Sequence, residues 1–143
     1  MIYTKMTKLA MKISFDGHRD QVDKTGLPYV FHPFHLAECM NDEQTVVVAL
    51  LHDIIEDTDM TAERLLEVGI SKECVDAISL MTHAPEVPYM DYVKEIKKNP
   101  IARAVKIADL RHNSDMTRLD VIDEYAIKRA EKYKAALELL LED

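Results

Sequence analysis

A histidine and an aspartate stand side by side in the most apolar segment of the chain. This segment, residues 46–55, reads VVVALLHDII, and eight of its ten residues are apolar. A helix of this composition is buried on nearly every side. Yet His52 and Asp53 lie inside it, and Glu56 and Asp57 follow one turn later. Because a buried, unpaired carboxylate costs several kcal/mol, these groups need polar partners or a metal ion.

Two further polar residues are expected to point inward. Asp109 continues an apolar stripe within residues 101–108, and His32 precedes Pro33 where a polar loop enters a helix. Two imidazoles and two carboxylates suit a divalent ion such as Mn²⁺, Fe²⁺, Co²⁺ or Zn²⁺, which activates water and polarises phosphorus–oxygen bonds. Spacing leaves a second interpretation open, in which each histidine is a core residue with an ordinary hydrogen-bond partner. His35, one turn after His32, is a less favoured additional ligand.

The scarcity of turn-forming residues favours long helices as the elements that position these groups. The 143 residues include 3 Gly and 5 Pro, well under the usual combined share of about 12%. Apolar periodicity and capping signals predict a compact all-α bundle in one domain, residues 1–143, with seven to nine helices. The expected helices cover residues 2–13, 33–40, 42–56 (capped by Asn41), two segments capped by Thr61 and Ser71, 89–98, 100–112 and 122–140, with a loop at 16–28 and Gly69 as a helix end.

Charge and apolar content exclude several classes of protein. The net charge is −8, from 18 basic and 26 acidic residues, which argues against binding to duplex nucleic acid. The longest apolar run, residues 46–51, is far below the roughly 20 residues that span a bilayer. No signal peptide is recognisable. Cys39 and Cys74 are expected to be reduced, buried thiols, so we expect a cytoplasmic protein with no membrane partner.

The order His32, His52-Asp53, Asp109 resembles the HD family of metal-dependent phosphohydrolases. Three flanking strings are more specific: GLPYVFHPFHLA, ALLHDIIEDTDMT and VKIADLRHNSD. They resemble the hydrolase domain of the bifunctional alarmone (guanosine tetraphosphate, ppGpp) synthetase/hydrolases and of their small stand-alone relatives. The resemblance extends from about residue 10 to residue 119, and no synthetase domain follows. It implies the helical bundle of the HD type.

The resemblance also implies a role for individual residues. One metal ion, most typically Mn²⁺ but with Fe²⁺, Co²⁺, Zn²⁺ or Mg²⁺ as other candidates, would be held by His32, His52, Asp53 and Asp109. The acidic pair Glu56 and Asp57 would position and deprotonate the attacking water. Asn113 would contact the nucleotide near its sugar, and Lys24 would contact phosphate. The implied reaction is hydrolysis of a 3′-pyrophosphate on a small nucleotide, with release of pyrophosphate.

Three more basic residues are candidates for binding an anionic substrate, namely Arg19, Lys106 and Arg111. For Lys106 and Arg111, which flank Asp109, exposure to solvent is an equally favoured interpretation.

Two departures from the family pattern concern nucleotide recognition. Asp23 stands where the family has an arginine that stacks on guanine, and the string NSDMTRL adds Asp115 and displaces Arg118. Two alternatives to an alarmone hydrolase therefore stay open: an HD-type phosphatase of another nucleotide or phosphate ester, and a non-catalytic nucleotide-binding module. The sequence gives no indication of the oligomeric state.

Overall fold

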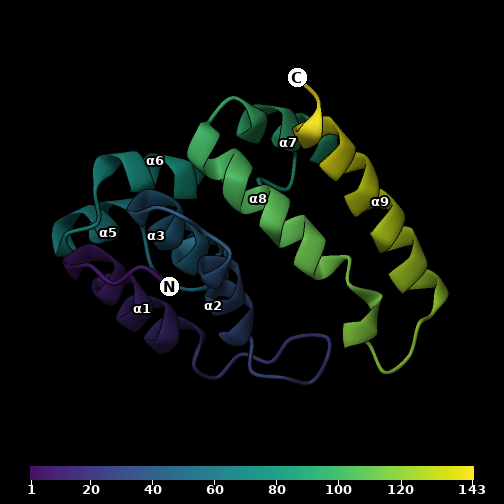
Figure 1. Ribbon diagram of the computed structural model, residues 1–143, viewed down its shortest axis with the longest axis horizontal. Coiled ribbons are helices and arrows are strands. Elements are labelled where there is room, and N and C mark those ends of the chain that lie inside the picture. The colour runs from purple at the N-terminus through teal and green to yellow at the C-terminus, as the bar shows by residue number, and fades with distance from the viewer.

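The most apolar helix, α3, lies at the centre of the fold. In the computed structural model, which describes residues 1–143, every residue from Thr45 to Leu51 is buried. Helix α3 packs against α1, α2, α6 and α8. Figure 1 shows α1, α2, α3, α5 and α6 gathered on one side and α7 and α9 on the other, with α8 running between the two groups. The elements are α1 (Lys5–His18), α2 (Phe31–Glu38), α3 (Glu43–Leu51), α4 (Ile54–Asp57), α5 (Ala62–Val68), α6 (Lys72–Leu80), α7 (Tyr89–Lys97), α8 (Pro100–Asn113), the 3₁₀ turn η1 (Met116–Arg118) and α9 (Glu124–Leu141).

Side-chain caps start most of these helices, and the expected all-α class is confirmed. Thr61, Ser71 and Asn99 each accept hydrogen bonds from backbone N–H groups of the first turn, where those groups lack helical partners. Gly69 ends α5 in the left-handed region at φ +115°. The predicted cap Asn41 is wrong, because Asp42 takes that role by accepting from the Thr45 amide.

The predicted helix over residues 42–56 is interrupted at the histidine and aspartate. Helix α3 ends at Leu51, and α4 begins at Ile54. Between them Asp53 has φ −107° and ψ 4°, outside the helical region. Apolar periodicity continues through this break, so the sequence pattern did not indicate it. As a consequence His52 stays in the core while the Asp53 carboxylate, about a quarter exposed, reaches the surface of a cavity.

A short loop, residues 19–30, closes one end of the bundle and is the least regular part of the chain. Its centre is a turn in which Gly26 has φ +83°, and the backbones of Val22 and Pro28 form an isolated bridge. The loop was predicted from residue 16, but α1 continues to His18. Figure 1 shows the loop beside the end of α8 that leads into η1.

Two remaining expectations concern membranes and thiols. None of the helices combines the length and the apolar character that a bilayer crossing requires. Both cysteines are free, and Cys74 is buried as expected. The expectation that Cys39 is buried is wrong, because it directly follows the last residue of the short helix α2 and faces outward.

Candidate metal centre and adjoining pocket

The three elements that carry the predicted ligands bring their side chains to one point. His32 lies in the first turn of α2, His52 caps the C-terminal end of α3, and Asp109 lies in the last turns of α8. Asp109 Oδ1 is 2.8 Å from His32 Nε2 and 3.6 Å from His52 Nε2. Asp53 Oδ2 is 3.2 Å from His52 Nε2. One ligand atom from each of His32, His52 and Asp109 lies within 4.8 Å of the others, and all three residues are buried.

The hydrogen bonding of His52 supports a cation at this point. Its Nδ1 lies 2.8 Å from the Ala49 carbonyl oxygen, to which it donates. Its Nε2 is buried without a hydrogen-bond partner and faces both carboxylates. Burial lowers the pKa of His52, but the charges of Asp53 and Asp109 outweigh it and raise the pKa well above its ordinary value. A site that favours positive charge at a buried imidazole nitrogen suits a divalent ion in the same place.

The surrounding groups orient the candidate ligands. Tyr29 donates a hydrogen bond to Asp53 Oδ2, and His112 Nδ1 lies 2.7 Å from His32 Nδ1. Burial raises the pKa of Asp53, but His52 and the Tyr29 hydroxyl outweigh it and hold that pKa at about 2. Contacts of this kind fix the rotamer and the protonation state of a metal ligand.

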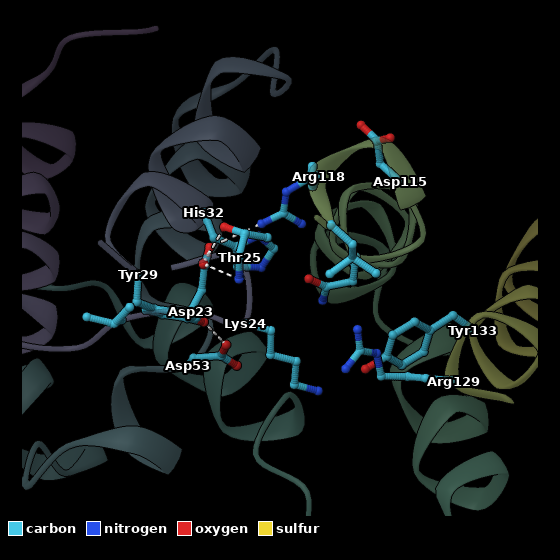
Figure 2. Close-up of a pocket in the computed structure, with 13 residues that line it drawn as sticks. Asp23, Lys24, Thr25, Tyr29, His32, Asp53, Asp115, Arg118, Arg129 and Tyr133 are labelled. Carbon is cyan, nitrogen blue, oxygen red and sulfur yellow. Dashed lines mark hydrogen bonds and ion pairs between the residues drawn. The ribbon is translucent and has the colours of Figure 1, made fainter. Parts of the chain in front are cut away.

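A cavity of about 310 Å³ opens beside the cluster, and His32 and Asp53 are among the residues that line it. Figure 2 shows three basic side chains around it: Lys24 from the loop, Arg118 from η1 and Arg129 from α9, with Tyr133 next to Arg129. Asn113 also lines the cavity and donates to Asp109 Oδ1 over 3.0 Å. The lining also includes the carboxylates of Asp23, Asp53 and Asp115, so cations and acids alternate around the candidate metal ligands.

The acidic pair predicted to act on water lies just outside this lining. Glu56 and Asp57 are both exposed, and Glu56 Oε1 accepts a hydrogen bond from the His83 amide over 2.8 Å. Partial burial, together with the charges of Asp53 and Glu56, raises the pKa of Asp57 to about 6. A carboxylate with that pKa can accept a proton near neutral pH.

The five residues predicted to bind substrate are not brought together. Lys24 and Asn113 line the cavity. Arg19 is exposed and pairs with Asp16 over 2.6 Å, and Arg111 is exposed beside a separate cavity of about 780 Å³ between α2, α3 and α8. Lys106 is buried with its Nζ 2.8 Å from Asp109 Oδ2, so its ammonium group contacts a candidate ligand and does not itself line the cavity.

Several pocket residues were not among the predicted site residues. Tyr29 belongs to the GLPY string quoted above, and membership of that string was the only feature of the sequence that could have identified it as a site residue. Arg129 and Tyr133 stand four residues apart on one face of α9, where Tyr133 reads as part of an apolar stripe. No signal in the sequence indicates that the C-terminal helix reaches the site.

The two departures from the family pattern are partners in the structure. Asp23 Oδ1 accepts from the Thr25 amide over 2.8 Å and from the Leu27 amide over 3.2 Å, which holds the loop. Asp23 Oδ2 pairs with Arg118 over 3.3 Å, and Arg118 also donates to the His112 carbonyl oxygen over 2.9 Å. Both side chains are largely buried. Their ion pair therefore joins the loop to η1 at the rim of the pocket.

Comparisons with known proteins agree with this architecture. No family model matches the chain. It is 32% identical over 136 residues to the guanosine-3′,5′-bis(diphosphate) 3′-pyrophosphohydrolase of Aquifex aeolicus, covering 87% of this chain and 18% of that protein. It is 34% identical over 134 residues to a GTP pyrophosphokinase of Myxococcus xanthus, covering 82% and 17%. The chain thus spans less than a fifth of the length of these relatives.

A solved structure of a metazoan SpoT orthologue, described as hydrolysing ppGpp, superposes with a TM-score of 0.76 at 19% identity, over 99% of this chain and 88% of that one. The chain has the all-helical fold of this orthologue, and a buried His–His–Asp cluster lies within it. More particularly, the chain is a homologue of the ppGpp 3′-pyrophosphohydrolases and related GTP pyrophosphokinases, matching one segment of them.

Proposed function

We propose that the chain is a divalent-metal phosphohydrolase that removes pyrophosphate from the 3′ position of guanosine 3′,5′-bis(diphosphate). One observation carries the proposal: a buried His–His–Asp cluster, with Asp53 beside it, adjoins a cavity whose lining includes three basic side chains. The likeness to ppGpp 3′-pyrophosphohydrolases supports this substrate. Two free cysteines are in keeping with a reducing cytoplasmic compartment.

The metal ion, for which we propose Mn²⁺, would be held by His32, His52, Asp53 and Asp109. When bound, a divalent ion there would offset phosphate charge and polarise the scissile phosphorus–oxygen bond. Because the His52 Nε2 atom is buried and unpartnered and two carboxylates converge on it, the donors fit such an ion. The same set accepts several first-row ions, so the ligands do not select one by type alone.

The chain's own residues would bind the anion and handle the protons. Lys24 and Arg129 reach the cavity from the loop and from α9 (Figure 2) and would bind the phosphates. In hydrolysis the water oxygen bonds to the phosphorus next to the 3′ oxygen, and the bond from that phosphorus to the 3′ oxygen breaks. Asp57 would take the proton from water, while Glu56, held by the His83 amide, would help position the water. The proton taken up by Asp57 would then pass to the departing 3′ oxygen, and the products are pyrophosphate and guanosine 5′-diphosphate.

Chromatography of the products of ppGpp incubated with the protein and Mn²⁺ tests the proposal. We expect equal amounts of pyrophosphate and guanosine 5′-diphosphate. Asp53→Ala and Asp109→Ala should each lose about 1000-fold or more in rate, since each removes a candidate ligand. Arg64→Ala, at an exposed pair that belongs neither to the ligand cluster nor to the cavity lining, is the control and should keep the wild-type rate. Absence of pyrophosphate release from the wild-type protein would refute the proposal.

A second candidate function keeps the centre and changes the substrate to another nucleotide or phosphate ester. The Asp23–Arg118 pair favours it, because a carboxylate replaces a cation at the rim and neutralises a second cation there. A panel of nucleoside monophosphates, 3′-phosphates and ppGpp, assayed with Mn²⁺, separates the two functions by which product appears. Calorimetric binding without turnover of any member would instead indicate a nucleotide-binding module.

A further inference from the structure

Lys106 is a buried lysine whose charge has one polar partner. It lies in α8 one turn before Asp109 and is 9% exposed. Its Nζ donates to Asp109 Oδ2 over 2.8 Å and makes no other hydrogen bond. Two rings enclose the ammonium group, with Nζ 5.4 Å from the Tyr92 ring centroid and 6.0 Å from that of Tyr89. A cation held in such surroundings is fixed in place and poorly screened by solvent.

The two oxygens of Asp109 have different partners. Oδ1 faces the two imidazoles, at 2.8 Å from His32 Nε2 and 3.6 Å from His52 Nε2, and accepts from Asn113. Oδ2 is turned toward Lys106. Because the lysine engages one oxygen, the carboxylate is arranged to offer a single oxygen to a cation between the histidines. Lys106 thus controls the geometry with which Asp109 can bind a metal ion.

The lysine also changes the charge of the centre. Asp53 and Asp109 together carry two negative charges, which a divalent ion would cancel. The ammonium of Lys106 adds one positive charge within contact of Asp109. With the lysine present, a loaded centre keeps a net positive charge next to the pocket. The ammonium group repels the metal ion, and the net positive charge of the loaded centre attracts an anionic phosphate group.

We propose that Lys106 is a positioning residue that weakens metal binding at this centre in return for a single-oxygen geometry at Asp109 and a net positive charge facing the substrate. This rests on the proposed metal-dependent function. The proposal predicts that replacing Lys106 strengthens metal binding, which is the opposite of what a purely structural role predicts. A lysine that only supported the fold would, when replaced, loosen the site and weaken metal binding.

Three substitutions separate charge from position. Lys106→Gln keeps a donor for Asp109 Oδ2 and removes the charge, Lys106→Met removes both, and Lys106→Arg keeps the charge. Lys132→Met is the matched control. Its ammonium lies 4.1 Å from the centroid of the same Tyr89 ring, and its side chain is exposed with no contact to Asp109.

Titration calorimetry of each protein with Mn²⁺ alone, with no nucleotide present, is the test. We expect Lys106→Gln to bind Mn²⁺ at least about 10-fold more tightly than the wild type, because an unscreened repulsion is lost. Lys106→Arg and Lys132→Met should bind as the wild type does. In steady-state assays Lys106→Gln should raise KM for the anionic substrate. Should Lys106→Met unfold, the glutamine variant decides, and its thermal melting confirms that it is folded.

Two outcomes count against the proposal and can be told apart. If the wild type binds Mn²⁺ and Lys106→Gln binds it equally or more weakly, the role of Lys106 is refuted while the proposed function stands. If the wild-type protein binds no divalent ion at all, the proposed metal centre fails, and the role of Lys106 fails with it.

Discussion

The ion pair between Asp23 and Arg118 should stabilise the fold measurably, although each partner departs from the family pattern. The two atoms lie 3.3 Å apart, and the side chains of Asp23 and Arg118 are 12% and 20% exposed. At an effective dielectric constant near 20, two unit charges at that distance attract by about 5 kcal/mol. Desolvation of both groups offsets most of this. We therefore expect a coupling free energy of about 1–2 kcal/mol from a double-mutant cycle of Asp23→Asn and Arg118→Gln.

Urea unfolding of the four proteins of the cycle, followed by circular dichroism at low and high salt, measures this coupling. Asparagine keeps the Oδ1 acceptor for the loop amides, so the cycle isolates the ion pair from the turn. The exposed pair Arg64–Glu67 is a matched control, because its atoms are also 3.3 Å apart while its side chains are 62% and 66% exposed. It should give about 0.5 kcal/mol or less, and lose even that at high salt. Equal coupling in the two pairs would refute the reasoning from burial.

Three further predictions concern single residues. The folded pKa of Asp57, about 6 against an ordinary 3.8, means that the folded protein holds this proton more tightly, so stability falls as pH rises from about 4 to 6. Asp57→Asn should have the same melting temperature as the wild type near pH 4 and should lose activity. Above about pH 7 it should be more stable than the wild type by about 1 kcal/mol. The full pKa shift corresponds to roughly 3 kcal/mol, which we discount because the side chain is exposed. Tyr29→Phe removes the donor to Asp53 and should weaken Mn²⁺ binding or activity about 10- to 100-fold, with unchanged melting as evidence against a general fold defect. Gly69→Ala places a side chain at φ +115° and should cost about 1 kcal/mol in urea unfolding while hydrolysis stays at the wild-type rate.

The helical class and most helix starts were predictable because their causes are local. Caps such as Thr61 and Ser71 act within one turn, and apolar periodicity is a property of neighbouring residues. The break between α3 and α4 was not predictable in the same way. No glycine or proline stands at His52–Asp53, and the apolar pattern continues through it. The break turns His52 toward Asp109 of α8 and Asp53 toward Tyr29 of the loop. Local sequence patterns carry no information about partners so distant along the chain.

Similar reasoning separates the parts of the site. The four candidate ligands stood out because each is a polar group where burial is expected, and the structure brings them together around His52 Nε2. Lys106 lies three residues before Asp109, a spacing that places two side chains next to each other on a helix. Its contact with Asp109 Oδ2 also depends on packing against Tyr89 and Tyr92, which the spacing does not indicate. Arg129 came from a helix with no motif, so only the folded chain shows that it faces the pocket.

The net charge of −8 does not by itself oppose the proposed anionic substrate, because three basic side chains line one cavity. Lys24, Arg118 and Arg129 come from a loop, a 3₁₀ turn and the last helix, and the fold brings them around one cavity. One of them, Arg118, is already paired with Asp23. The unpaired attraction for substrate therefore rests on Lys24 and Arg129. Neutralising Lys24 or Arg129 should raise KM more than neutralising Arg118. If the total charge of the pocket attracted the substrate, all three substitutions would raise KM equally, so measuring KM for each variant separates the two explanations.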